Sequence, residues 1–232
     1  MVDGLEIVVN GPSNGIHGIA INTDADEIYA VSYTADWLYK IIVPTGSIIG
    51  TPMDASINNP PYIETHRLKP IECVHVNDSL LFVTCSGGLW TDPWTGDQEQ
   101  INGQVQLWNT NSMELIDTYE YDWNSTPWHI IDSPISNDIY VVLSGDQLYE
   151  ETAGVSKLSY SDNGMLSQQW YLTDEIFDTL HGIDISVYGD EIYVSGRSDG
   201  YLHTINSAEG VLLHSIPLSN NLSALGTPIT LI

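Results

Sequence analysis

Basic residues are scarce in this sequence. Its 232 residues include 5 Lys and Arg against 31 Asp and Glu, which gives a formal net charge of -26 at pH 7. Nucleic-acid binding depends on Lys and Arg that neutralise phosphates, so we expect no nucleic-acid partner. Anionic membrane surfaces are disfavoured for the same reason. We interpret the charge as a solubilising surface, with attraction of cations as the alternative.

Long apolar runs are also missing. No segment approaches the roughly 18 consecutive apolar residues that a membrane-spanning helix needs, so we expect no membrane insertion. Residues 1–4 lack the charged and apolar regions of a secretory signal. The chain is therefore expected to be intracellular, or to be exported after removal of a signal that this sequence does not contain.

Cysteine is limited to Cys73 and Cys85, which lie on consecutive predicted strands. The tight turn at residues 77–78 would not place them opposite each other, so we predict free buried thiols and no disulfide. Their apolar surroundings should raise the thiol pKa, which argues against a cysteine nucleophile. The sequence also contains no Gly-x-Ser-x-Gly elbow and no phosphate-binding glycine loop.

The residues that are abundant indicate a strand-rich fold. There are 13 Tyr, 7 Trp and 19 Gly, and no window shows helical periodicity over a helix length. Four units recur, each with four short strands separated by Gly, Asp, Asn and Ser turns: residues 14–53, 71–120, 127–172 and 180–218. Such units predict an all-β fold, a β-propeller of four-stranded antiparallel blades. A β-sandwich is the alternative, but it does not explain the repeat.

The two ends of the sequence are predicted to be single strands, at residues 5–9 and 225–232. If they pair, they close the ring as a reduced fifth blade, and residues 1–232 form one propeller domain. Two alternatives remain open. The sequence could be cut from a larger propeller, or an oligomer could form in which another subunit supplies the missing strands.

The repeat resembles a known family at two places. The sequence His-Gly-Ile-Ala at residues 17–20, followed by Glu-Ile-Tyr-Ala-Val at residues 27–31, has a counterpart at residues 181–195. Both resemble the YVTN-type repeats of bacterial and archaeal surface propellers and are similar to the repeats of lactonase-like propellers. The resemblance implies a propeller and favours an extracellular or cell-surface location, with a cytoplasmic one still open. It implies little about function, since such repeats serve enzymes and binding modules alike.

A histidine precedes the first predicted strand in three units, at His17, His129 and His181. Alternation places Glu72 at the corresponding position of the second unit, and Thr227 at that of the last strand. In a propeller these positions converge on the mouth of the central channel. Three imidazoles and a carboxylate there predict a divalent transition-metal site for copper, iron or zinc. In an enzyme, such a metal would activate water or dioxygen. The alternative is a structural role, a hydrogen bond from each histidine to the next blade.

The other histidines are interpreted differently. His75 and His203 lie between apolar residues within predicted strands, so we expect packed or edge side chains. His214, on an outer strand, should be exposed.

Long loops are predicted on the same face as the histidines, at residues 86–103 and 144–154. They carry Trp90, Trp94 and Tyr149, which could stack on a small molecule, a glycan or a protein. The alternative is that these aromatics pin the loops to the blades. The competing functional hypothesis is therefore a non-catalytic surface or scaffold propeller that binds a protein or glycan through this loop face.

Overall fold

The computed structural model describes residues 15–54, 67–77, 79–92, 95–145, 153–161 and 164–218. All regular structure in these ranges is β-strand, in four antiparallel four-stranded sheets and one separate hairpin. None of the described residues forms a helix that is long and apolar enough to cross a membrane. The strands expected at residues 5–9 and 225–232 lie outside the described residues, as does Thr227.

The four sheets follow the four sequence units, and we call them blades 1 to 4. Blade 1 contains β1 (Ile16–Ile21), β2 (Glu27–Ser32), β3 (Trp37–Ile42) and β4 (Ser47–Pro52). Blade 2 contains β5 (Pro70–Val76), β6 (Leu80–Cys85), β9 (Gln104–Asn109) and β10 (Glu114–Glu120). Blade 3 contains β11 (Pro127–Asp132), β12 (Asp138–Leu143), β13 (Gly154–Tyr160) and β14 (Leu166–Leu172). Blade 4 contains β15 (Leu180–Ile185), β16 (Glu191–Gly196), β17 (Tyr201–Asn206) and β18 (Val211–Pro217).

The separate hairpin consists of β7 (Gly88–Thr91) and β8 (Gln98–Ile101), and it is inserted between the second and third strands of blade 2. The sequence predicted a long loop here, and the structure differs because residues 88–91 and 98–101 pair as strands. The hairpin leaves blade 2 through Gly87, whose φ of 61° suits glycine.

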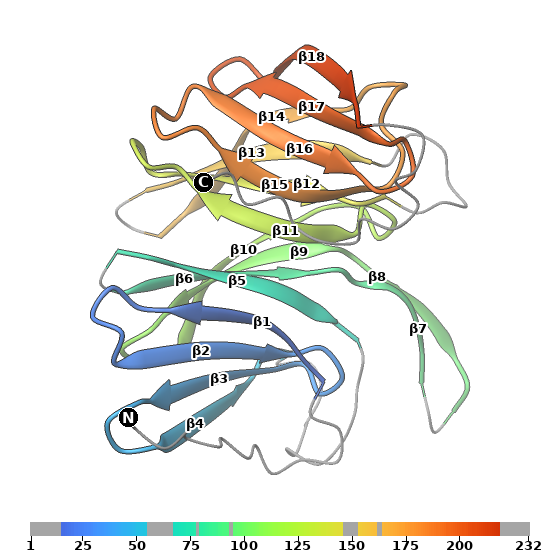
Figure 1. Cartoon of the computed structure of the whole chain (residues 1–232). Coiled ribbons are helices and arrows are strands. Elements are labelled where there is room, and N and C mark those ends of the chain that lie inside the picture. The colour runs from blue at the N-terminus through green and yellow to red at the C-terminus, as the bar shows by residue number, and fades with distance from the viewer. Residues whose placement is uncertain are drawn as a thin grey trace.

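Successive blades pack face to face through apolar side chains. One cluster joins Tyr29 and Leu38 of blade 1 to Leu81 and Val83 of blade 2. A second cluster joins blades 2 and 3, and a third joins blades 3 and 4. The first strands β1, β5, β11 and β15 contact each other in this order, so they lie at the centre of the arrangement (Figure 1). Among the described residues, no apolar cluster joins blade 4 to blade 1.

Every first strand carries a β-bulge near its start. In blade 1 the pairing moves from Ile16↔Ser32 to Ile19↔Ala30, so β1 holds one extra residue. The same irregularity follows Pro70, Pro127 and Leu180 in the other blades. Bulges re-aim side chains and are common next to functional sites. Here the repeated bulge positions the side chains at one end of the central channel, its mouth.

Candidate functional site at the channel mouth

The bulge residues define the candidate site. Each bulge follows the first ladder pair of its strand, and the two residues after that pair are, in blades 1 to 4 in turn, His17-Gly18, Ile71-Glu72, Trp128-His129 and His181-Gly182. The sequence predicted that His17, His129 and His181 occupy equivalent positions. In the structure, His129 lies one residue further along its strand than the other two. Ile71 and Trp128 stand where His17 and His181 stand, and Glu72 and His129 occupy the glycine positions of blades 1 and 4.

The structure nevertheless brings these side chains together. The Glu72 carboxylate accepts a hydrogen bond from His129 Nδ1 at 2.6 Å and a second one from the backbone N of Ile130 at 3.0 Å. The His129 and His181 rings lie edge to face, with their centroids 4.9 Å apart. Glu72, His129 and His181 therefore form a continuous cluster from three adjacent blades, which we call the mouth cluster.

The ring of His17 contacts Trp128, which also contacts His181. The Trp128 ring lies 5.8 Å from the ring of His17 and 5.5 Å from that of His181, measured between centroids. His17 Nδ1 donates a hydrogen bond to the carbonyl oxygen of Ile71 at 2.9 Å. This contact to the next blade is the structural role considered above for such a histidine.

The surroundings favour a neutral imidazole at His181. Burial is the largest cause, and together with the nearby His129 and Arg197 it lowers the pKa of His181 to about 4, against the opposing effect of Glu72. At neutral pH the ring therefore keeps a nitrogen lone pair, the form that binds metal ions or accepts a proton.

Two buried polar atoms at the mouth have no hydrogen-bond partner, His129 Nε2 and Trp128 Nε1. Buried nitrogens are normally paired, because an unpaired polar group costs about 1–3 kcal/mol. In a neutral His129 whose proton lies on Nδ1 facing Glu72, Nε2 is an acceptor or a metal ligand, whereas Trp128 Nε1 can only donate. Among the described residues, no three His, Cys, Asp or Glu side chains are already placed to hold one metal ion together.

Of the three aromatic residues predicted on the loops, the structure describes Trp90. Trp90 lies in β7, packs against the cluster between blades 1 and 2, and has the Arg67 guanidinium 5.9 Å from its ring centroid. Arg67 in turn pairs with Asp54 at 2.7 Å and Glu99 at 2.8 Å. These contacts support the alternative in which Trp90 holds the inserted segment against the blades. Trp94 and Tyr149 lie outside the described residues.

A hydrogen-bonded network in blade 4 was not anticipated as a whole. His203 is fully buried, as expected for a packed residue, and its Nε2 donates to Asp199 at 3.0 Å. Its Nδ1 accepts from the Ser215 hydroxyl at 2.9 Å, and Phe177 covers the ring. A Ser-His-Asp order can support nucleophilic catalysis. Here, however, Ser215 pairs directly with His203 in the β17–β18 ladder and the imidazole is closed from solvent. The network therefore links the outer strand β18 to β17.

Other expectations can be compared directly with the structure. Cys73 and Cys85 are free and buried, as predicted, and burial raises the pKa of both thiols. His214 is exposed, also as predicted.

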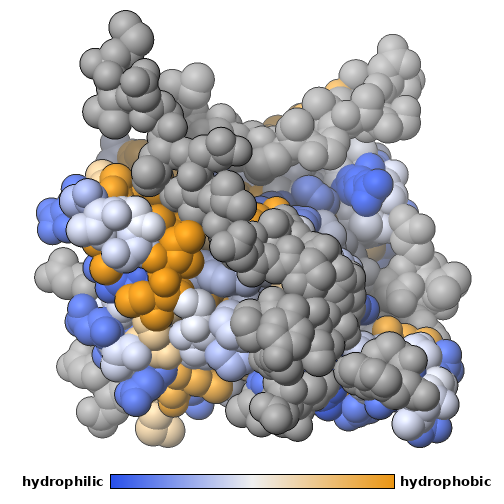
Figure 2. All heavy atoms as spheres, turned by 90° about the horizontal axis from the view of Figure 1, so that it is seen from below, coloured by the Kyte–Doolittle hydropathy of each residue, from blue (hydrophilic) through white to orange (hydrophobic). Residues whose placement is uncertain are grey.

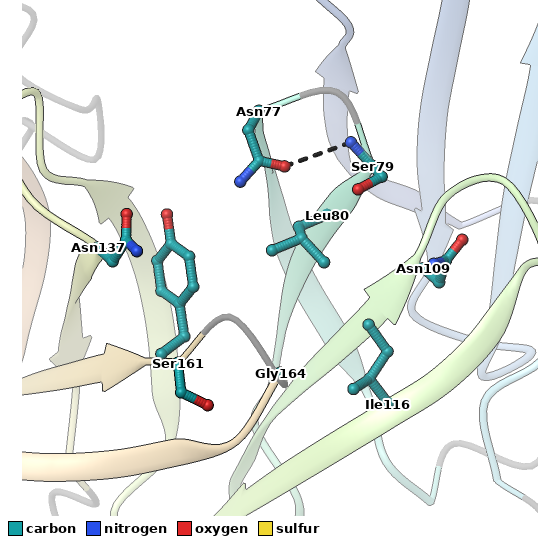
Figure 3. A pocket seen from close by; sticks show the side chains of 9 residues that line it. Asn77, Ser79, Leu80, Asn109, Ile116, Asn137, Ser161 and Gly164 are labelled. Atoms are coloured by element: carbon teal, nitrogen blue, oxygen red, sulfur yellow. Dashed lines mark hydrogen bonds between the residues drawn. The ribbon is translucent and has the colours of Figure 1, made fainter.

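A separate pocket of about 330 Å³ lies between blades 2 and 3. Asn77, Asn109, Asn137 and Ser161 line it, together with the apolar side chains of Leu80 and Ile116 (Figure 3). Because Asn77 follows the last residue of β5 and Glu72 lies near its start, the pocket opens at the end of the blades opposite the mouth cluster. It therefore shares no residue with that cluster.

Four antiparallel four-stranded sheets, arranged around their first strands, define the chain as a β-propeller protein. No protein-family model matches the chain, and no curated protein matches it. The membership of the YVTN-type family stays a prediction.

Solved structures share the fold at low sequence identity. A putative 6-phosphogluconolactonase from Bacteroides uniformis ATCC 8492 is 15% identical, with a TM-score of 0.59, over 88% of this chain and 54% of its own. A functionally unknown protein from Desulfotomaculum acetoxidans DSM 771 is 14% identical, with a TM-score of 0.62, over 89% of this chain and 57% of its own. The dihydro-heme d1 dehydrogenase NirN is 14% identical, with a TM-score of 0.61, over 88% of this chain and 38% of its own. This chain thus spans about half the length of the first two structures, and the likeness concerns the fold alone.

Proposed function

We propose that the mouth cluster binds a divalent transition-metal ion, copper, iron or zinc, with His129 and His181 as the primary ligands. The observation that carries the proposal is the buried Nε2 of His129, which has no hydrogen-bond partner while Nδ1 is held by Glu72. Metal-bound histidines commonly donate their second ring N–H to a carboxylate, which fixes the tautomer and the ring orientation. Glu72 is therefore a positioning residue in this proposal, and not a direct ligand.

The second ligand is supported by the neighbouring ring. His181 lies 4.9 Å from His129 between centroids, and its low pKa of about 4 keeps it neutral at physiological pH. Metal ions compete with protons for imidazole, so a neutral ring binds more readily. Nitrogen ligands of this type suit copper, iron and zinc.

His17 is left out of the primary ligand set because its ring contacts Trp128 and Tyr33, and its Nδ1 is held by the Ile71 carbonyl oxygen. A metal ion held by two imidazoles keeps positions open for water or a substrate. The Trp128 Nε1–H, which lacks a partner, would then be available to donate a hydrogen bond to a group bound there.

The proposal is tested on protein purified without a histidine tag. Isothermal titration with Cu²⁺ and with Zn²⁺ should show about one site per chain for at least one of these ions. His129→Ala and His181→Ala should each weaken binding at least about tenfold, and Glu72→Gln should weaken it by about 10–100-fold. The exposed His214 gives the matched control, so His214→Ala should bind as tightly as the unaltered chain.

Equal metal binding by the unaltered chain and the His129→Ala, His181→Ala double variant would overturn the proposal. The proposal would also be overturned if the unaltered chain showed no saturable binding of Cu²⁺ and none of Zn²⁺. The remaining hypothesis would then be a non-catalytic propeller that binds a glycan or protein at its loop face. That alternative predicts ligand binding that chelators leave unchanged and Trp90→Ala weakens.

A further inference from the structure

The pocket between blades 2 and 3 is lined by uncharged groups, and none of its described lining residues is acidic or basic. This is unusual surroundings for a chain with 31 Asp and Glu. A cation site would present carboxylate oxygens to the ion. An anion would need a basic group nearby to offset the repulsion from a net charge of -26. The lining therefore favours an uncharged ligand.

The polar lining is dominated by asparagine amides, two of which are oriented by turns of the chain itself. Asn77 Oδ1 accepts a hydrogen bond from the backbone N of Ser79 at 3.3 Å. Asn109 Oδ1 accepts one at 2.9 Å from the backbone N two residues further on. Since the oxygen of each amide is held by the backbone, its Nδ2 is left as a donor. Within the described part of the chain, neither Nδ2 atom donates to the protein, and the Asn137 amide makes no hydrogen bond.

The remaining lining is largely aliphatic. Leu80 and Ile116 lie among the amide and hydroxyl groups (Figure 3). The Tyr160 ring also borders the pocket, but it is 7% exposed and packs on Phe82, with the centroids 5.1 Å apart. It is therefore no platform on which a flat base could stack. A sugar fits this lining better, because its hydroxyls donate and accept hydrogen bonds while its C–H faces pack on aliphatic side chains.

We propose that this pocket binds an uncharged mono- or disaccharide. The amides of Asn77, Asn109 and Asn137 donate to oxygen atoms of the sugar, and Leu80 and Ile116 contact one of its C–H faces. The volume of about 330 Å³ lies at the lower end of the roughly 300–1,000 Å³ found for small-molecule sites, which suits one or two sugar rings. The pocket shares no residue with the mouth cluster, so this site is independent of the proposed metal site.

The next pair of blades indicates how the pocket can be filled. The atom nearest to a Cβ built on Gly164 of blade 3 belongs to Ile116, on the outer strand of blade 2. Between blades 3 and 4, the atom nearest to a Cβ built on Gly210 belongs to Trp170, on the outer strand of blade 3. The indole Nε1 of Trp170 donates to the carbonyl oxygen of Ser207 at 3.1 Å. An indole is larger than the side chain of isoleucine, so Ile116→Trp should occupy the space that the sugar needs.

Saturation-transfer NMR and calorimetric titration of the full chain, in the presence of EDTA, test the proposal. The probes are glucose, galactose, mannose, N-acetylglucosamine, maltose, cellobiose and lactose. We expect saturable binding of at least one of them, and binding of the corresponding uronate at least about tenfold more weakly. Ile116→Trp should abolish binding, and Asn137→Ala should weaken it about 3–10-fold. Leu115→Trp is the matched control, because Leu115 lies in the same strand, is 44% exposed and lines a separate pocket with Arg67. It should bind as the unaltered chain does.

The variants also assign the site. A sugar could contact apolar residues elsewhere, such as those that Figure 2 shows at the surface on the side where blade 1 lies. Binding that a folded Ile116→Trp variant leaves unchanged would therefore overturn the proposal. Unchanged binding by Asn137→Ala would do the same, and this variant decides the question if circular dichroism shows that Ile116→Trp does not fold. The proposal would also be overturned if none of the sugars bound saturably, if the uronate bound as tightly, or if adenosine or uridine bound in the pocket instead.

Discussion

At the residue scale, three of the five basic side chains lie beside both a carboxylate and an aromatic ring. Lys40 pairs with Glu27 at 2.6 Å, lies 5.9 Å from the Tyr29 ring centroid, and donates to the carbonyl oxygen of Thr110 in blade 2. Blade 3 repeats the arrangement with Lys157, Asp138 and Tyr140. These positions recur because each carboxylate precedes its tyrosine by two residues on the same face of a strand. In a chain so rich in acid, a buried lysine gains partners without competition from other cations.

The Glu27 pair gives a prediction for pH. Burial by itself would raise the pKa of Glu27, but the hydrogen bonds from Lys40 and Tyr29 lower it below its ordinary value. The unfolded chain therefore binds the proton more readily than the folded one, and the stabilisation is present at neutral pH and lost as pH falls through the folded pKa. Glu27→Gln should lower the free energy of unfolding by about 1–2 kcal/mol at pH 7. The difference from the unaltered chain should shrink between pH 5 and pH 3.

Urea denaturation at pH 7, 5 and 3 measures this difference. Glu191→Gln provides the matched control, because Glu191 accepts from Tyr193 but Thr204 stands where Lys40 and Lys157 stand in blades 1 and 3. At pH 7, Glu191→Gln should therefore lower the free energy of unfolding by less than Glu27→Gln does. A Glu27→Gln penalty that stays constant with pH would contradict the assignment.

At the element scale, the first strands of neighbouring blades approach closely at glycine. A Cβ on Gly18 would lie 2.5 Å from the Glu72 Cα and 2.7 Å from the Ile71 carbonyl oxygen. Both atoms belong to the backbone of β5, so they cannot rotate away. Gly18→Ala should therefore separate β1 from β5 and lower the free energy of unfolding by about 1–3 kcal/mol. Ile48→Ala, on the outer strand of the same blade, should cost much less. Thermal and urea denaturation measure both, and equal losses would contradict this account of Gly18.

The strands themselves could be predicted from the sequence. The repeat units predicted at residues 127–172 and 180–218 contain the strands β11 to β14 and β15 to β18 that the structure shows. What the pattern could not give is the bulge at the start of each first strand, because an extra residue leaves the composition of the strand unchanged. That bulge moved His129 and Glu72 into the position of Gly18 and placed Trp128 beside His17. The meeting of Glu72, His129 and His181 followed from blade symmetry, but Trp128 was missed.

At the scale of the whole molecule, the net charge opposes compactness. Sequence composition gives the charge of -26, but it does not reveal that at least three of the five basic residues are already paired with carboxylates. Most acidic groups are therefore left without a cation, and their mutual repulsion favours the more expanded unfolded chain.

Salt concentration therefore has two opposing effects on stability. Screening weakens the ion pairs of Lys40, Arg67 and Lys157, each worth up to about 1 kcal/mol where exposed. It also weakens the repulsion among the many unpaired carboxylates, and this effect should dominate at a net charge of -26. We expect the melting temperature to rise by several degrees, about 2–4 °C for each kcal/mol gained, between 0.05 M and 0.5 M NaCl. Calorimetry at several protein concentrations separates this rise from any change in association. NaCl and choline chloride should act alike, because screening depends on ionic strength and not on the cation, and a fall in melting temperature with either salt would show that the ion pairs dominate.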